Sequence, residues 1–335
     1  MKHDEEIAQA LRAMGLLRAG DGFTATPLLG GVSCDVWRVD LASGRMCVKR
    51  ALPKLRVEAD WRAPPERAAT EVAWLKLAGT IVPGSAPAVL GEAPGQHMFA
   101  MEFLPPERHP VWKTLLAQGI ADAGVASRVG ETLARIHAAT AGRHDITRAF
   151  STQTQFHALR LEPYLLHTAN RHPDVGARIR AVAQSVADAR IALMHGDISP
   201  KNILVGPNGP VFLDAETACY GDPAFDLAFC LNHLLLKCVW HPDRAQAYVE
   251  SFEALRSAYR RGVNWEEPAA PDMRAAALLG TLLLARIDGK SPVEYLTGEG
   301  DKDFVRQTAR WLLAAKGLTL DDARDAWRAA LARRR

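Results

Sequence analysis

The chain has 335 residues, of which 48% are hydrophobic and 24% charged, so it can bury a sizeable core and is long enough for two lobes. Its 41 basic and 38 acidic residues leave a net charge of +3, and this near-balance gives no reason to expect nucleic acid or a membrane as a partner. The five cysteines are scattered without a Cys-x-x-Cys pair, which argues against disulfides and a zinc site and indicates a reducing compartment, the cytoplasm.

The first hundred residues show mainly strand-like patterns, and the rest of the chain shows mainly helical ones. The expected strands are 23–29, 35–41, 45–52 and 96–103. One helical segment, 64–78, interrupts them, with Pro64 and Pro65 in its first turn. The expected later helices are 120–139, 153–166, 175–189, 225–239, 244–259, 273–287, 303–315 and 320–334, and only 193–214 returns to strand patterns.

This change of pattern predicts an α+β fold with two lobes. The first, residues 1–104, would hold a small antiparallel sheet, and the second, residues 107–335, would be larger and mainly helical. A hinge at about 101–106 would join them.

A turn with two adjacent glycines joins the first two expected strands. Gly30 and Gly31 allow the backbone to approach a phosphate closely, and N–H groups in the same turn, which includes Ser33, can donate to its oxygens. Two glycines are equally typical of a hairpin turn, so this motif alone does not identify a phosphate site.

Lys49 lies inside an apolar strand, where an unpaired ammonium group would be costly. Glu71 on the following helix is the natural partner. Such a pair is typical of kinases, in which the lysine binds the α- and β-phosphates of ATP and the glutamate orients it. The alternative is a lysine that reaches solvent at the strand edge and a glutamate on an exposed helix face.

The segment 195–216 sets acidic and amide groups between short apolar strands. Asn202 follows Asp197 by five residues, and Asp214 ends the next apolar run. Asp197 can accept the proton of an attacking hydroxyl, while Asn202 and Asp214 can supply hard oxygen ligands to Mg²⁺ on the ATP phosphates. The alternative is a polar turn in which these residues only cap and turn the chain. The ordered set favours a phosphotransferase.

These motifs resemble the aminoglycoside phosphotransferase and choline kinase superfamily. The resemblance rests on His-Gly-Asp at 195–197, Asn202, Asp-Ala-Glu at 214–216 and the run 220–228. It implies a bilobal protein-kinase-like fold and an ATP-dependent small-molecule kinase.

The resemblance also implies roles for individual residues. Glu216 would help to hold the metal, although an ordinary surface carboxylate is the alternative, and Asp226 would support the catalytic loop from the start of a helix. Residues 99–104 resemble the kinase hinge, where adenine would bond the backbone of Glu102 and Leu104, next to Met101.

A second resemblance, densest over residues 46–113, is to 5-methylthioribose kinases. It includes the segment 49–57, which follows the ATP lysine, and Trp61. That family usually lacks the asparagine found here at Asn202 and carries paired arginines in a C-terminal helix that grip the sugar. This chain offers one arginine in that region, Arg286, followed by Asp288.

The acceptor-binding residues therefore remain alternatives. Arg286 either binds a sugar or interacts as a charge with the helix end, with Asp288 beside it. Trp61 either closes over the substrate or packs beneath its loop.

The predicted function is transfer of the γ-phosphate of ATP, with Mg²⁺, to a hydroxyl of a sugar-like or amino-alcohol metabolite. We expect methylthioribose to be at best a poor substrate, because the sugar clamp lacks one cation. The alternatives are a catalytically idle nucleotide-binding scaffold and an aminoglycoside-modifying resistance kinase, which would need a strongly acidic site. The expected partner is the small-molecule acceptor, and a second copy of the chain is a further candidate.

Overall fold

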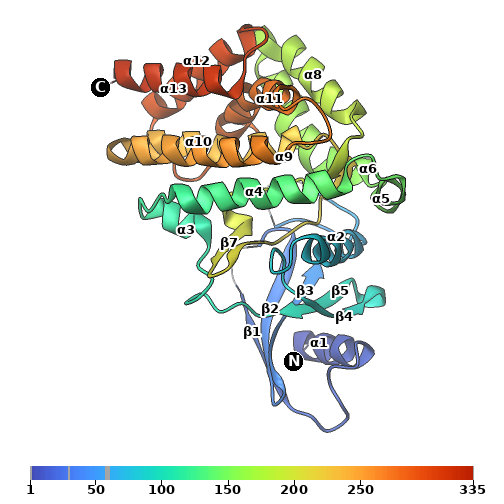
Figure 1. Ribbon diagram of the computed structural model, residues 1–335. Helices are drawn as coiled ribbons and strands as arrows, with labels where there is room; N and C mark the ends of the chain where they lie inside the picture. The colour runs from blue at the N-terminus through green and yellow to red at the C-terminus, as the bar shows by residue number, and fades with distance from the viewer. Residues whose placement is uncertain (1, 29–30, 57–60, 335) are drawn as a thin grey trace.

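The computed structural model describes residues 2–28, 31–56 and 61–334, and it gathers the strands of the first part into one antiparallel sheet of order β1-β2-β3-β5-β4 (Figure 1). The strands are β1 (Phe23–Pro27), β2 (Cys34–Leu41), β3 (Gly44–Ala51), β4 (Val89–Ala93) and β5 (Met98–Glu102). The α+β class with a small antiparallel sheet is confirmed. Strand β4 was not expected, because Gly91 and Glu92 interrupt its apolar pattern.

The two faces of the central strand β3 pack against different helices. Met46 and Val48 join the cluster formed with α1 (Lys2–Ala13), whereas Cys47 and Ala51 join the core that includes α2 (Arg67–Ile81). Because side chains alternate along a strand, Lys49 shares the face of Cys47 and points towards α2. Figure 1 shows the two helices on opposite sides of the sheet.

Both helices in the first part of the chain differ from what the sequence predicts. Helix α1 was not expected, because its many charged residues obscure the buried Ile7, Ala10 and Leu11. Helix α2 begins at Arg67 rather than at residue 64. The two prolines lie in the turn before it, where the carbonyl of Pro64 accepts the N–H of Arg67.

The remainder of the chain is mostly helical, as expected. Its helices are α3 (Trp112–Ala117), α4 (Ala123–Thr140), α5 (His144–Ala149), α6 (Gln153–Phe156), η2 (His157–Leu166), α7 (His167–Arg171), α8 (Pro173–Asp188), α9 (Ala224–Trp240), α10 (Ala245–Gly262), α11 (Ala269–Asp288), α12 (Glu299–Ala314) and α13 (Leu320–Arg334). Helix α9 is buried along almost its whole length. The wider π-helical turns of η2 contain Pro163, which cannot donate a backbone hydrogen bond. None of the described helices is long and apolar enough to cross a membrane.

Two short strand pairs lie where the helices meet the sheet-bearing part. Strand β6 (Ala192–Met194) pairs with β9 (Cys219–Gly221), and β7 (Ile203–Gly206) pairs with β8 (Gly209–Phe212). They hold between them the loop that leads into the turn η3 (Pro200–Asn202) and the segment that follows β8. Each of these two polar segments is therefore anchored at both ends by a strand.

The close approach of α4 and α10 yields a test of the helical packing. A Cβ added at Gly130 of α4 would lie 2.1 Å from the carbonyl oxygen of Leu255 on α10. We expect Gly130→Ala to lower the free energy of unfolding by about 1–3 kcal/mol, because the two backbones must separate. Chemical denaturation measures this change.

Gly79 provides the matched control, since it also lies in a helix but has open space around its added Cβ. Gly79→Ala should leave stability unchanged or raise it by up to about 1 kcal/mol, because alanine is the better helix former. Equal effects of the two substitutions would contradict the close backbone contact between α4 and α10.

Candidate active site

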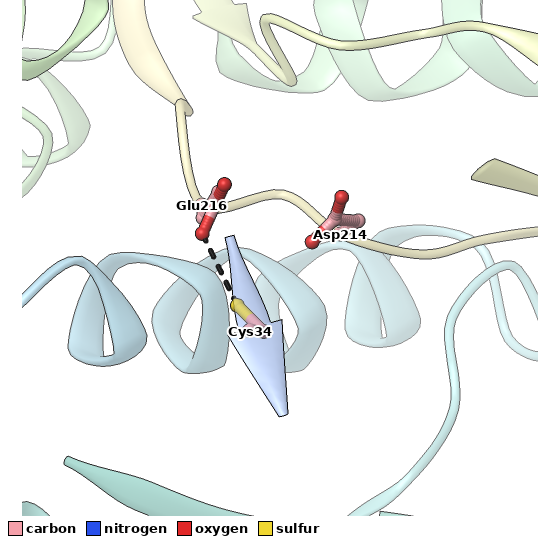
Figure 2. Close-up of side chains that lie close together, drawn as sticks. All are labelled: Cys34, Asp214 and Glu216. Atoms are coloured by element: carbon pink, nitrogen blue, oxygen red, sulfur yellow. Dashed lines mark hydrogen bonds between the residues drawn. The ribbon is translucent and has the colours of Figure 1, made fainter. Parts of the chain in front are cut away.

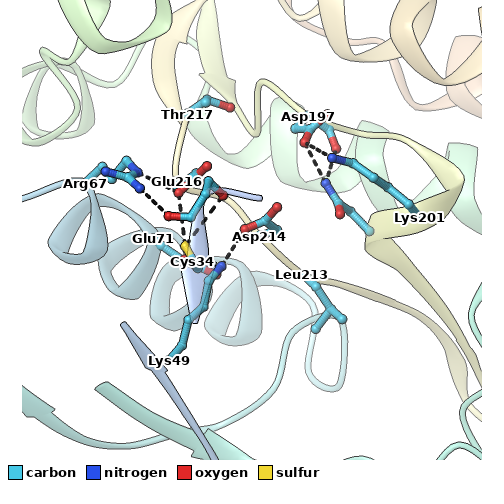
Figure 3. A network of polar contacts seen from close by, with 12 residues as sticks. Cys34, Lys49, Arg67, Glu71, Asp197, Lys201, Leu213, Asp214, Glu216 and Thr217 are labelled. Carbon is cyan, nitrogen blue, oxygen red and sulfur yellow. Dashed lines mark hydrogen bonds and ion pairs between the residues drawn. The ribbon is translucent and has the colours of Figure 1, made fainter. Parts of the chain in front are cut away.

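Lys49 lies at the centre of a buried group of charges that joins the sheet, α2 and the segment after β8 (Figure 3). Its ammonium nitrogen is 2.8 Å from Oε1 of Glu71 and 2.5 Å from Oδ1 of Asp214. Lys49 is only 4% exposed, so both carboxylates are needed to balance its charge away from water. The exposed alternative for Lys49 and Glu71 is wrong.

The charged side chains in this group shift one another's pKa values. Burial disfavours the ammonium, but Asp214 and Glu71 outweigh burial and raise the pKa of Lys49 well above its ordinary value. Burial also opposes the charge of Asp214, yet Lys49 and Lys201 lower the pKa of this carboxyl well below its ordinary value. Burial raises the pKa of Glu71 to about 7, despite Lys49. Of the two carboxylates, Asp214 therefore holds its charge more firmly.

Asp214 reaches Lys49 from an unusual backbone conformation. Its φ of 66° lies in the left-handed region, which aspartate tolerates better than most residues. The preceding residue is held on both sides, because the N–H of Leu213 donates to the carbonyl of Asn202 and the Leu213 carbonyl lies 3.0 Å from Nε2 of His195. These contacts fix the point where the chain leaves β8.

Asp197 lies on the loop after β6 and is only 2% exposed. The amide of Asn202 donates to Oδ2 of Asp197 at 2.8 Å, which leaves the side-chain oxygen of Asn202 for another ligand. Arg160 of η2 approaches the same carboxylate to 2.8 Å, and Lys201 approaches it to 3.3 Å. The carboxylate is thus held in place by three side chains from two segments.

Asp226 ties the Asp197 loop to the first turn of α9. Its two carboxylate oxygens accept the backbone N–H groups of His195 and Gly196, at 2.7 and 2.8 Å. Nε2 of His137 lies 3.3 Å from the same side chain. Gly196 has a φ of 79°, and an added Cβ would lie 2.7 Å from the carbonyl oxygen of Thr217, so only glycine fits this turn.

Glu216 is a second buried carboxylate, 5% exposed, so the surface alternative is wrong. Arg67, which is fully buried, donates to Oε2 of Glu216 at 2.7 Å and uses its remaining donors on backbone carbonyls, including that of Ser33. Arg67 therefore ties Glu216 to the glycine turn and to the start of α2.

The carboxylates of Asp214 and Glu216 and the thiol of Cys34 offer ligand atoms that lie within 4.8 Å of one another (Figure 2). Burial raises the pKa of the Cys34 thiol well above its ordinary value, and its sulfur donates to Glu216 at 3.4 Å. A hard cation such as Mg²⁺ prefers oxygen ligands. The two carboxylates fit such an ion, whereas the protonated thiol does not.

The residues expected to contact the nucleotide lie at two ends of the sheet, because β2 begins beside Ala51 of β3 whereas β5 ends beside Met46. The N–H of Glu102 donates to the carbonyl of Ala88, so this N–H is not available to adenine. In the described parts of the chain, the N–H of Leu104 has no backbone partner, and Met101 is buried beside them on β5. Gly30 lies outside the described residues, while Gly31 and Ser33 lie just before β2.

The three predicted acceptor residues lie in different surroundings. Trp61 donates to the carbonyl of Ala158 and packs beside Leu159, which favours the packing interpretation. Both carboxylate oxygens of Asp288 are bound by Arg306, at 2.9 and 2.7 Å, so the structure gives no support for placing Asp288 at an acceptor.

Arg286, unlike Asp288, is connected with the Asp197 loop through its contacts. Its guanidinium carbon is 5.8 Å from the ring centre of Tyr164, and that of Arg160 is 5.7 Å from the same ring. Because Arg160 binds Asp197, the ring of Tyr164 connects Arg286 with this carboxylate.

Sequence reasoning did not assign roles to Arg67 or Arg160, two buried arginines in contact with the predicted site. A signal was present, since Arg160 lies between Leu159 and Leu161 and Arg67 lies on the apolar face of its helix. A buried guanidinium needs acceptors, but the sequence does not show which ones.

Comparison with known proteins agrees with this arrangement. Residues 24–262 match the family model described as the phosphotransferase enzyme family. Methylthioribose kinases from Pectobacterium carotovorum and Pectobacterium atrosepticum are each 28% identical, over 57% and 70% of this chain and 54% and 65% of their own length. The chain thus spans between half and two thirds of the curated relatives it matches.

The fold is also that of solved kinases. A choline/ethanolamine kinase family protein from Mesorhizobium loti superimposes with a TM-score of 0.56 at 16% identity, over 99% of both chains. This likeness confirms the protein-kinase-like fold.

The bond between Arg67 and Glu216 can be tested through stability. Arg67→Met leaves a carboxylate buried without its partner, so we expect the free energy of unfolding to fall by about 3–5 kcal/mol. Denaturant titration at neutral pH measures the loss.

A second substitution separates the lost charge partner from lost packing. The double variant Arg67→Met with Glu216→Gln should recover part of the stability that Arg67→Met loses. Arg45→Met is the control, because it removes a surface ion pair with Asp40, and it should lower the free energy of unfolding by at most about 1 kcal/mol. If Arg67→Met behaved like Arg45→Met, the buried pair would not support the site.

Proposed function

The chain belongs to the phosphotransferase enzyme family, and from this premise we propose that it is an ATP-dependent kinase that phosphorylates a hydroxyl of a small molecule. Residues 1–104 would clamp ATP, and residues 107–335 would carry the catalytic loop and bind the acceptor. The five cysteines are free and buried, which supports a reducing location such as the cytoplasm.

One observation carries this proposal: the ion-paired Lys49 and the Asp197 loop are separate polar units brought together across Asp214. Lys49 contacts both Glu71 and Asp214, while Asp197 is bound by Asn202 and not by Lys49. A kinase needs this division, because one set of groups must hold the phosphates and another must address the acceptor. An idle scaffold has no need of a buried Asp197 held by three side chains.

The nucleotide would bind to the first set of groups. Lys49, oriented by Glu71, would bind the α- and β-phosphates, and the backbone at Gly31 and Ser33 would approach them. Adenine would bond the Glu102 carbonyl and the Leu104 N–H beside Met101. Mg²⁺ would be held by Asn202, Asp214 and Glu216, and it would neutralise charge on the phosphates.

Asp197 would act on the acceptor hydroxyl. As the acceptor oxygen forms its bond to the γ-phosphorus, the bond from that phosphorus to the β-γ bridging oxygen breaks, and the hydroxyl proton passes to Asp197. The loop need not move, because Asn202, Arg160 and Asp226 already fix the position of Asp197 and its backbone. ADP and a phosphate ester are the products.

The acceptor proposed is a small polar metabolite with a primary or sugar hydroxyl. The curated relatives are methylthioribose kinases, but a charged hydrogen bond missing from a sugar clamp costs about 1.5–3 kcal/mol, or roughly tenfold to a hundredfold in affinity. We therefore expect methylthioribose to be a poor substrate for a site with Arg286 as its single helix arginine.

Replacing Asp197 tests the chemical role directly. Asp197→Asn should lower kcat by about 10²- to 10⁴-fold, because the variant cannot accept the hydroxyl proton. ATP affinity should stay within about twofold, since this side chain addresses the acceptor. Steady-state ADP release and equilibrium ATP binding give the two values, with the exposed Asp243→Asn as the charge-matched control. A kcat close to that of the unmodified enzyme would contradict the role.

Replacing Asp214 tests the metal role. Asp214→Ala should abolish Mg²⁺-dependent ATP binding, because the carboxylate would link the metal to the phosphates. Asp214→Asn is the sharper variant, since asparagine tolerates the φ of 66° while it removes the charge. ATP titrations at several Mg²⁺ concentrations measure the effect. Titration curves that match those of the unmodified enzyme would refute the assignment.

A further inference from the structure

Three side chains that lie one helical turn apart follow one face of α9, and the first of them packs against Tyr164. Phe229 packs 5.4 Å from the Tyr164 ring and 5.8 Å from the ring of His233, as measured between ring centres. Lys237 follows His233 by four residues and therefore lies on the same face of the helix. This face of α9 thus runs from the neighbourhood of the Asp197 loop to a buried lysine.

Lys237 is a buried amine without a hydrogen-bond partner in the described parts of the chain. The residue is 1% exposed. Its nitrogen lies 4.1 Å from the centre of the Trp240 ring and 3.7 Å from that of Tyr295, so aromatic faces are its main contacts. Burial, together with the nearby charge of Lys113, lowers the pKa of Lys237 to about 7. An anion would supply the partner that the protein does not.

Arg286 is a second cation with unused hydrogen-bonding capacity. Its Nε is buried without a partner, and its Nη1 donates to the carbonyl and hydroxyl oxygens of Ser291. Within the described residues it forms no ion pair with a carboxylate. Through the shared ring of Tyr164 it lies beside Arg160, which binds Asp197.

Several positive charges lie near His233 and lower its pKa together. Burial lowers the pKa of His233 well below its ordinary value, and Arg286, Lys237, Lys201 and Lys113 lower it further.

The nearby carboxylates are already paired. Glu294 binds Lys113, and Asp197 is shared between Arg160 and Lys201. Among the described residues around His233, Arg286 and Lys237 are cations without an ion-paired carboxylate.

We propose that Arg286 and Lys237, with Lys201 at the exposed side, bind an oxyanion on the acceptor, so that the molecule phosphorylated is an anionic alcohol. Lys201 contacts Asp197 and has 52% of its side chain exposed, so it offers a cation on the solvent side of the catalytic carboxylate. The inference rests on the proposed kinase function and specifies the acceptor as a hydroxylated carboxylate or a phosphate ester.

The same contacts argue against a cationic acceptor. Trp240 and Tyr295 stack with their ring centres 4.5 Å apart, and such aromatic faces could receive an ammonium group. Here the ammonium group of Lys237 already occupies their faces. A choline-like or aminoglycoside acceptor would meet this lysine and Arg286, and like charges repel at such distances.

A set of compounds that share one carbon chain tests the charge preference by binding. The set is gluconate, glucitol 6-phosphate, neutral glucitol and cationic N-methylglucamine, titrated by ligand-observed NMR into the full-length enzyme with Mg²⁺ and ADP. We expect at least one anion to bind about tenfold or more tightly than glucitol, and N-methylglucamine to bind more weakly than glucitol. The two anions distinguish a carboxylate from a phosphate ester.

Variants locate the binding at these cations. Arg286→Gln with Lys237→Met should remove the preference for the anion, while Arg286→Lys should retain part of it and the exposed Lys316→Gln should retain all of it. Thermal unfolding of each variant checks that it folds. Equal binding of the charged and neutral compounds, or an anion preference that survives the double substitution, would overturn the inference.

ADP release with the same four compounds separates this inference from the kinase function. Anion-selective binding that depends on Arg286 and Lys237 supports the inference even when no ADP is released, and the kinase proposal alone then loses support. Efficient phosphorylation of glucitol or N-methylglucamine in preference to the anions would support the kinase and overturn the anionic acceptor.

Discussion

The buried charge of Lys49 is the constraint on which the rest of the structure depends. An ammonium group in the middle of a sheet requires carboxylates, and it takes one from α2 and one from the segment after β8. The bond to Glu71 holds α2 against the sheet, and the bond to Asp214 joins the sheet-bearing part of the chain to the helical part. Asp214 is thereby held in its left-handed conformation at the junction, close to Glu216. The nucleotide and metal groups are arranged by the same interactions that fold the molecule.

The helical part provides a rigid support for the second polar unit. Asp226 holds the backbone of the Asp197 loop, His137 lies against Asp226, and Tyr259 of α10 lies 3.0 Å from Nδ1 of His137. The close contact between α10 and Gly130 of α4 fixes the distance between these two helices, and it therefore holds these hydrogen-bonded side chains in place. Asp197 is therefore positioned by core packing, which explains why its loop tolerates so many polar groups away from water. The cations on α9 and α11 border this same support.

The sequence predicts those parts of the site in which the chemistry is local or a buried charge demands a partner. The spacing of Asp197 and Asn202 is set within one loop, and Lys49 in an apolar strand requires a carboxylate such as Glu71. Arg67 was missed because Glu216, its partner, lies 149 positions away along the chain. Lys237 carried no signal, since it resembles the cation expected in the last turn of a helix. That it has no hydrogen-bond partner among the described residues emerges only when α9 packs against its neighbours.

The central claim is that the two polar units together transfer phosphate from ATP to a small hydroxyl compound. ADP release with Mg²⁺ and ATP, measured across a panel with methylthioribose, choline, homoserine, aminoglycosides and hydroxy acids, tests this most directly when product masses are recorded. We expect an anionic alcohol to raise ADP release far above the rate with water and to gain one phosphoryl group. ADP release that no member of the panel stimulates, and that Asp197→Asn leaves unchanged, would contradict it.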